Sequence, residues 1–201
     1  MNSVLWIIFY VFAVLSFIPV IKLEEVKSNK THRRLWFLSL AIFMWTLIIA
    51  FKFVVEEPFV VYYLQLLTYP IVALITYLLY ETFQHYTKRK TSDYFHFVFI
   101  TFIVSNLLIS LTNPFHQLMI QLPLTSSTTI QSFSDASYGI FFYIHAFISY
   151  LVLMVGFIKL LVFVKQDRKK NVSAFPFQLV LYSIIFGIGI NVVNIFFYSF
   201  V

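Results

Sequence analysis

Apolar positions along the chain fall into six long runs, and short polar segments separate them. Each run has the roughly 20 mostly apolar residues that a helix needs to cross a bilayer. The predicted spans are residues 4–21, 35–55, 59–81, 94–112, 138–164 and 177–200. The pattern therefore predicts an all-α membrane protein, a bundle of six transmembrane helices that forms a single domain over residues 1–201.

The composition supports this interpretation. Hydrophobic residues make up 61% of the 201 residues and charged residues only 11%, whereas a water-soluble fold needs more polar side chains to cover its surface. The chain has no cysteine, which excludes disulfides, thiolate metal sites and cysteine nucleophiles. No basic residue precedes the first apolar run in the amino-terminal MNSVLWIIFY. This segment is therefore predicted to be a spanning helix rather than a cleaved signal peptide.

Lysine and arginine gather in alternate loops. The first, third and fifth loops carry five, three and four of them, whereas the N-terminus and the second and fourth loops carry none. These residues are Lys22, Lys27, Lys30, Arg33, Arg34, Lys88, Arg89, Lys90, Lys165, Arg168, Lys169 and Lys170. Because cytoplasmic loops collect basic residues, we expect the N-terminus outside the cell and these three loops in the cytoplasm. The net charge of +6 is then a topology signal, and no nucleic-acid partner is expected.

Polar residues recur on one face of each of the last three predicted spans. They are Asn106, Ser110 and Asn113 in the fourth span, Tyr138, His145 and Ser149 with Tyr150 beside them in the fifth, and Ser183, Gly187, Asn191, Asn194 and Tyr198 in the sixth. One interpretation is helix packing, because small and hydrogen-bonding residues line the interfaces of membrane bundles. The other is a polar pocket in the outer half of the bundle, where Asn113, His145 and Asn194 are all expected to lie.

His145 is an ionisable residue within a predicted span. It lies seven residues inside the fifth span, which is about 10 Å below the outer end at about 1.5 Å per residue. An ionisable residue at such a depth is a candidate for function. The alternative is a neutral histidine that hydrogen-bonds to a neighbouring helix, and the sequence leaves both interpretations open.

The segment LTNPFHQLM, residues 111–119, places polar residues and a proline where the fourth span leaves the membrane. Asn113 is a suitable N-cap and Pro114 a suitable first residue for a new helix. The residues Phe115, Leu118, Met119 and Leu122 then recur at the spacing of one apolar helix face, which ends at Pro123. We therefore expect a short interfacial helix in the extracytoplasmic loop 113–137, lying on the membrane surface over the bundle. His116 is not needed to form this helix and remains to be explained.

Three of these features together resemble a known family. Residues Thr112 to His116 spell TNPFH directly after the fourth span, the fifth span contains YGIFFYIHAFISY with His145 and Tyr150, and the sixth contains NIFFY with Asn194 and Tyr198. In these features the chain resembles the N-terminal seven-transmembrane sensor region of bacterial histidine kinases, which is also found on some diguanylate cyclases. The resemblance covers all six spans in order and loop length, and TNPFH is its most specific motif.

The resemblance implies a protein of the bacterial cell membrane that receives an extracytoplasmic signal and passes it to a cytoplasmic kinase. The candidates for binding or sensing an unknown extracytoplasmic ligand are Asn113, His116, His145, Tyr150 and Asn194. The resemblance also implies a homodimer. The family has a seventh span and a catalytic region, whereas this sequence stops after the sixth span at Val201. We therefore expect a truncated sensor module that is not itself an enzyme.

Other functions have weaker support in the sequence. A small-molecule transporter or channel is one alternative, but the spans lack inward acidic residues or an arginine array, and no internal repeat is evident. A partner-dependent membrane subunit is a second alternative. Haem ligation by His116 and His145 is disfavoured because His116 is expected at the rim of the bundle. No Gly-rich phosphate loop or HExxH motif indicates an enzyme, so we expect no cofactor or metal, and the lipid bilayer is the partner we expect.

Overall fold

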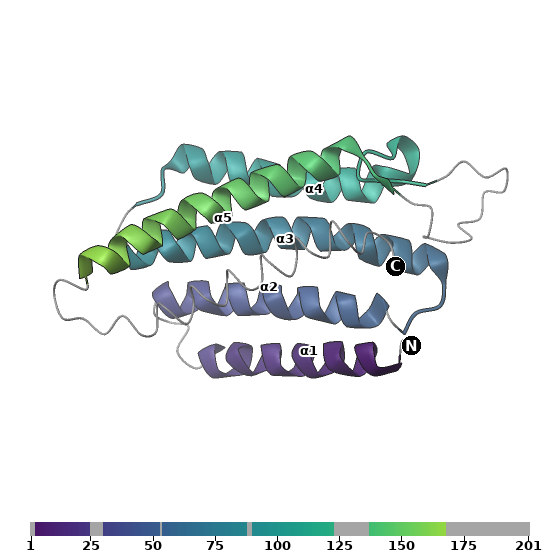
Figure 1. Cartoon of the computed structure of the whole chain (residues 1–201), viewed down its shortest axis with the longest axis horizontal. Helices are drawn as coiled ribbons and strands as arrows, with labels where there is room; N and C mark the ends of the chain where they lie inside the picture. Colours follow the sequence, from purple (N-terminus) through teal and green to yellow (C-terminus); the bar gives the residue numbers. More distant parts are fainter. Residues whose placement is uncertain (1–2, 25–29, 53, 88–89, 123–136, 168–201) are drawn as a thin grey trace.

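The computed structural model describes residues 3–24, 30–52, 54–87, 90–122 and 137–167. Within these ranges the chain forms five long helices and one short two-stranded sheet (Figure 1). The helices are α1 (Ser3–Glu24), α2 (Lys30–Lys52), α3 (Pro58–Tyr86), α4 (Asp93–His116) and α5 (Ile140–Asp167). The strands β1 (Ile120–Gln121) and β2 (Ser137–Tyr138) pair antiparallel, with Ile120 opposite Tyr138.

The helices correspond to the first five predicted spans, and the all-helical fold class is confirmed. Four described stretches are long and apolar enough to cross a membrane: His32–Lys52, Pro58–His85, Asp93–His116 and Ile140–Phe163. The predicted sixth span, residues 177–200, lies outside the described residues, so the count of six stays a prediction.

Local signals at the helix starts explain two of these boundaries. Pro58 is the first residue of α3. Proline is suited to this position because a backbone N–H there would have no partner within the helix. Ser92 is the N-cap of α4, because its hydroxyl accepts a hydrogen bond of 3.2 Å from the backbone N–H of Phe95. Both helices continue past the predicted spans, α3 as far as Tyr86 and α4 as far as His116.

The helices lie side by side, and α3 is the central one (Figure 1). Helix α1 packs on α2, α2 packs on α3, and α3 contacts both α4 and α5. At one end of the bundle, here called the Asn113 end, α3 begins and α4 finishes. At the opposite end, called the Glu81 end, α3 finishes and α4 begins. Polar side chains from different helices meet at both ends.

Close packing between α3 and α5 depends on a glycine. A Cβ atom at Gly156 would lie 2.9 Å from a ring carbon of Phe83 and 3.4 Å from one of Tyr80. The absence of a side chain therefore lets α5 approach α3 closely, as small residues do in membrane bundles. Elsewhere a hydrogen bond joins neighbouring helices: the hydroxyls of Ser16 in α1 and Thr46 in α2 are 3.0 Å apart.

The distribution of polarity is inverted relative to a water-soluble protein. Large apolar side chains on α4 and α5 are exposed, including Phe97, Ile100, Leu108, Phe147 and Met154. The polar side chains Asn106, Ser110, Asn113, His145 and Ser149 on the same two helices are buried. An apolar exterior and a polar interior suit a bundle surrounded by lipid, where polar groups face the inside.

The prediction of a helix starting at Asn113 is wrong. Helix α4 continues through Asn113 and Pro114 to His116, and ends at Gln117, whose backbone is left-handed with φ 53°. Pro114 lies in the last turn of α4, where it has no N–H to donate to the carbonyl of Ser110 and so removes one hydrogen bond of the helix. Residues after Gln117 turn back and form β1. The predicted apolar face is accordingly split, since Met119 is fully buried whereas Phe115 is 89% exposed. The remainder of the loop, residues 123–136, lies outside the described residues.

Candidate functional site

Asn113 joins α4, α3 and the turn that follows α4. Its side-chain Nδ2 donates hydrogen bonds to the Tyr62 hydroxyl at 2.6 Å and to the Ile120 carbonyl at 2.8 Å. Its Oδ1 accepts from the backbone N–H groups of Met119 at 2.7 Å and Ile120 at 3.4 Å. The side chain is fully buried, and both donor hydrogens and the acceptor oxygen of its amide are in use. Asn113 therefore holds the turn rather than capping a helix.

His116 stabilises the same turn from the exposed side. Its Nδ1 accepts a hydrogen bond of 3.1 Å from the backbone N–H of Leu118. Its Nε2 is 3.0 Å from the hydroxyl of Thr112, which itself donates to the Leu108 carbonyl at 2.7 Å. Because the hydroxyl proton is directed to Leu108, the histidine proton belongs on Nε2, and the imidazole donates to Thr112. Three residues of the TNPFH motif, Thr112, Asn113 and His116, thus make hydrogen bonds within the fold.

The turn also completes the start of α5. The carbonyl of Met119 accepts a hydrogen bond of 2.9 Å from the N–H of Gly139. The carbonyl of Leu118 accepts one of 2.9 Å from the N–H of Phe141. The first N–H groups of a helix have no partner within the helix, and here the turn supplies it. A Cβ atom at Gly139 would lie 2.2 Å from the Leu118 carbonyl oxygen, so only glycine permits this contact. The end of α4 and the beginning of α5 therefore form one unit.

Aromatic rings pack directly beneath this unit. The buried cluster consists of Tyr62, Leu66, Tyr69, Met119, Ile120 and Phe142. Tyr138 stacks on Phe142 with a centroid separation of 3.7 Å and an interplanar angle of 10°. The cluster connects the turn to the next layer of the bundle, which contains His145.

His145 lies between two aromatic rings and is 4% exposed. Its ring is 5.6 Å from that of Tyr69 in an edge-on arrangement, and is stacked 6.0 Å from that of Phe102 on α4. Its Nδ1 is buried without a hydrogen-bond partner in the described residues. His145 therefore lies inside the bundle, and within the described residues its Nδ1 gives no support for the alternative in which it bonds to a neighbouring helix.

Three further buried side chains share this property. Asn106 Oδ1, Ser110 Oγ and Ser149 Oγ are also buried without a partner in the part of the chain that the structure describes. We call Asn106, Ser110, His145 and Ser149 the interior polar group; none of the four is more than 4% exposed. Asn106 does donate through Nδ2 to the Phe102 carbonyl at 2.8 Å, within its own helix. Most buried polar atoms in proteins have a partner, so four unpartnered atoms on two helices need an explanation.

The five predicted site residues are thus separated in the structure. Asn113 and His116 belong to the turn, and His145 lies deeper, beneath the aromatic cluster. Tyr150 is half-buried on α5, next to Ser149. Asn194 lies outside the described residues. In the described ranges, no three His, Asp or Glu side chains come together as metal ligands would.

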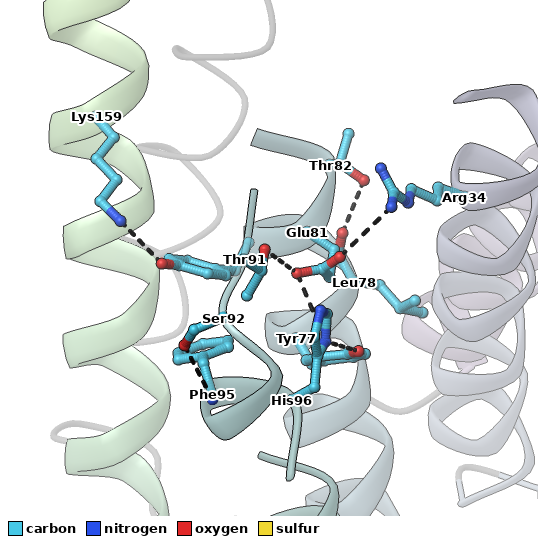
Figure 2. Close-up of polar contacts among 11 residues, drawn as sticks. Arg34, Tyr77, Leu78, Glu81, Thr82, Thr91, Ser92, Phe95, His96 and Lys159 are labelled. Atoms are coloured by element: carbon cyan, nitrogen blue, oxygen red, sulfur yellow. Dashed lines mark hydrogen bonds and ion pairs between the residues drawn. The ribbon is translucent and has the colours of Figure 1, made fainter. Parts of the chain in front are cut away.

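The Glu81 end carries a polar site that the sequence analysis did not identify. Figure 2 shows Glu81 of α3 between Arg34 of α2, Thr91 of the α3–α4 connection and His96 of α4. One carboxylate oxygen is 3.8 Å from the Arg34 guanidinium. The other accepts a hydrogen bond from the Thr91 hydroxyl and is 3.9 Å from the His96 Nδ1. That nitrogen is also 2.7 Å from the hydroxyl of Tyr77. Glu81 therefore connects three elements at this end.

The sequence carries only a weak signal for this junction. Glu81 coincides with the end of the third predicted span, where a charged residue is expected in any case. Its partners Arg34 and His96 are far from it in sequence, and only the packing of α2 and α4 against α3 brings them together. The one available hint is that Glu81 is acidic, whereas the KRK sequence of the following loop is basic.

The inverted polarity and the long apolar helices define a helical membrane protein. The family model described as the N-terminal 7TM region of histidine kinase matches residues 3–201. The match covers almost the whole chain, so the chain belongs to this family, which confirms the resemblance found through TNPFH. No curated protein and no solved structure matches the chain.

Proposed function

We propose that the chain is a membrane-embedded sensing module, the input region of a two-component sensor histidine kinase. Its membership of the histidine kinase 7TM family supports this role. The distribution of lysine and arginine supports an orientation in the bacterial cell membrane with the N-terminus and the Asn113 end outside and the Glu81 end in the cytoplasm. The proposed role is to receive a signal and relay it, as a homodimer, and no reaction is assigned to these 201 residues.

The observation that carries the proposal is the interior polar group. A buried polar atom without a hydrogen-bond partner costs roughly 1–3 kcal/mol. The fold satisfies Asn113 completely, whereas the four atoms of the neighbouring layer have no partner in the described residues. Polar residues inside a membrane bundle for which the described residues supply no partner are candidates for function.

The interior polar group provides a way for a signal to select between helix arrangements. A ligand or a helix movement that supplies partners for the His145 Nδ1 and Asn106 Oδ1 stabilises the arrangement in which those partners are present. Such a difference in affinity between two states is what a ligand needs in order to shift an equilibrium. The turn after α4 links the proposed outer surface to this group, because it holds the start of α5 five residues before His145.

The experiment uses the whole chain joined to a histidine-kinase catalytic region that drives a transcriptional reporter. His145→Phe keeps an aromatic ring between Tyr69 and Phe102 but removes the unpartnered nitrogen. Ser149→Ala removes an unpartnered hydroxyl from the same helix. If the group sets the balance between two states, each variant changes the basal reporter output roughly fivefold or more.

Thr76→Val is the matched control. Thr76 is equally buried, but its hydroxyl donates to the Val72 carbonyl within α3 at 2.9 Å. The control should insert normally and leave the output unchanged. Equal outputs from all three variants, with normal insertion in each, would show that the interior polar group does not take part in signalling. A steady ion or solute flux through the wild-type chain would instead favour the transporter alternative.

A further inference from the structure

A cavity of about 250 Å³ opens at the Glu81 end, between α2, α3 and the start of α4. The Glu81 junction forms one side of it, with Arg34, Thr91 and His96 pointing toward one another around the carboxylate (Figure 2). The rest of the wall comes from Gln84 and His85 of α3 and from Lys90 in the α3–α4 connection. The wall is therefore polar, unlike the apolar surface of the neighbouring helices.

Gln84 lines this cavity, and its side-chain amide is free of other hydrogen bonds in the described residues. Its side chain is 4% exposed, and within the described part of the chain the amide makes no hydrogen bond. Only its backbone carbonyl is occupied, by the Thr87 hydroxyl at 3.1 Å. A buried amide has two donor hydrogens and one acceptor oxygen. Because Gln84 lines the cavity, these groups are available to a molecule that enters it.

The charge of the wall favours an anion. Two basic residues, Arg34 and Lys90, line the cavity against one carboxylate, that of Glu81. The Glu81 charge is already matched, since Arg34 lies 3.8 Å away and Thr91 donates to it. Arg34 approaches Glu81 through one nitrogen, Nη2, and its side chain remains 39% exposed, so further N–H groups are available. Guanidinium, ammonium and amide donors together are the groups that proteins use to bind phosphate.

The position of the cavity agrees with this chemistry. It lies where α2 begins, α3 ends and α4 begins, which is the level of the lipid headgroups for a helix that spans the bilayer. Basic pockets between transmembrane helices bind anionic headgroups at this depth. We propose that the cavity binds a phosphate group, carried either by an anionic lipid or by free phosphate. Its occupant would share Arg34 with Glu81 and so contact the junction of α2, α3 and α4. This inference does not depend on the sensing role proposed for the interior polar group.

The test measures the thermal stability of the purified full chain in a neutral detergent. Short-chain phosphatidylglycerol, short-chain phosphatidylcholine and inorganic phosphate are titrated separately, because a ligand that binds the folded state raises the Tm. Phosphatidylglycerol should bind roughly tenfold more tightly than phosphatidylcholine. Stabilisation by inorganic phosphate as well identifies free phosphate as sufficient, whereas stabilisation by phosphatidylglycerol alone identifies the lipid as the source.

Two variants locate the site, and a third is the control. Lys90→Gln removes an exposed cation from the wall without disturbing the interior, and Gln84→Leu removes the buried amide at similar size. Each should weaken the binding roughly fivefold to tenfold. Lys165→Gln removes an exposed cation from α5 that does not line the cavity, and should change binding less than about twofold. Equal weakening by Lys90→Gln and Lys165→Gln, or equal binding of the two lipids without any effect of phosphate, overturns the proposal.

Discussion

The turn at Asn113 and the interior polar group are built from similar residues on the same helices, yet they differ in how their hydrogen bonds are used. In the turn, the Asn113 amide makes four hydrogen bonds, and both nitrogens of His116 have partners. In the interior polar group, one atom of each of four buried side chains has none in the described residues. Asn113 and Asn106 occupy the same face of α4, two turns apart.

The use of hydrogen bonds distinguishes a structural residue from a candidate functional residue more clearly than the residue type does. A fully bonded amide such as that of Asn113 fixes one geometry, because any movement breaks several hydrogen bonds at once. An atom such as the His145 Nδ1, which has no partner in the described residues, can accept a new partner when the helices move. The turn is thus suited to transmit a displacement as a rigid unit, and the interior polar group is suited to respond to it.

The largest expected effect comes from making the same substitution at both asparagines. Asn113→Leu removes four hydrogen bonds and leaves buried backbone groups of Met119 and Ile120 unpaired, so it should lower the free energy of unfolding by about 3–5 kcal/mol. Asn106→Leu removes only the intrahelical bond to Phe102 and should lower it by about 1 kcal/mol or less. Thermal unfolding in detergent measures both. Equal losses would mean that the two sites are not distinguished by their hydrogen bonds.

A second pair of substitutions compares two close backbone approaches. Gly139→Ala forces a Cβ atom against the Leu118 carbonyl, a backbone group that cannot rotate away, and should destabilise the protein by about 2–3 kcal/mol. Gly156→Ala meets the ring of Phe83, which can shift, and should cost about 1 kcal/mol. The two Tm values relative to wild type report the difference. A larger loss at Gly156 would show that the α3–α5 contact, rather than the turn, is the more rigid of the two.

Substitutions at His116 and Thr112 test whether these residues of the TNPFH motif stabilise the fold or contact the signal. His116→Ala removes the acceptor for the Leu118 N–H and the donor to Thr112 at an exposed position, so the expected loss is about 1 kcal/mol. Thr112→Val removes the partner hydroxyl and should cost no more. If the protein retains its stability in both variants but loses its signalling output in the reporter assay, His116 contacts the signal directly and the structural interpretation is incomplete.

The helices could be predicted from the sequence because lipid imposes a simple requirement. A run of about 20 apolar residues has few alternatives to a spanning helix, and each of the first five runs forms a helix over most of its length. The turn could not be predicted in the same way. Asn113 followed by proline is a common way to begin a helix, and only the positions of Tyr62 and Ile120 in three dimensions direct the Asn113 amide inward.

The candidate sites show the same limit. The depth of His145 in the span follows from the sequence, but its burial depends on the face of α5 that it occupies, because Ile144 and Phe147 at a similar depth are exposed. The junction around Glu81 depends on which helices are neighbours, and helix order in space is not encoded in hydrophobic periodicity. Arg34 in particular belongs to a run of loop cations that the sequence analysis used only for orientation. Only the structure singles it out, because α2 places its guanidinium 3.8 Å from the Glu81 carboxylate at the end of α3.

The smallest expected effect is a change in the free energy of unfolding whose sign is informative. Ser110→Ala and Ser149→Ala each remove a buried hydroxyl that has no partner in the described residues, so the folded state loses an unfavourable group and little packing. Each substitution should leave the free energy of unfolding unchanged or raise it by about 0.5–1 kcal/mol. Thr76→Val, which removes a bonded hydroxyl of similar burial, should instead lower it slightly. A loss of 1 kcal/mol or more in both serine variants would mean that these hydroxyls are paired in the folded protein. The interior polar group would then be a packing feature like Asn113, and the distinction between the two regions would disappear.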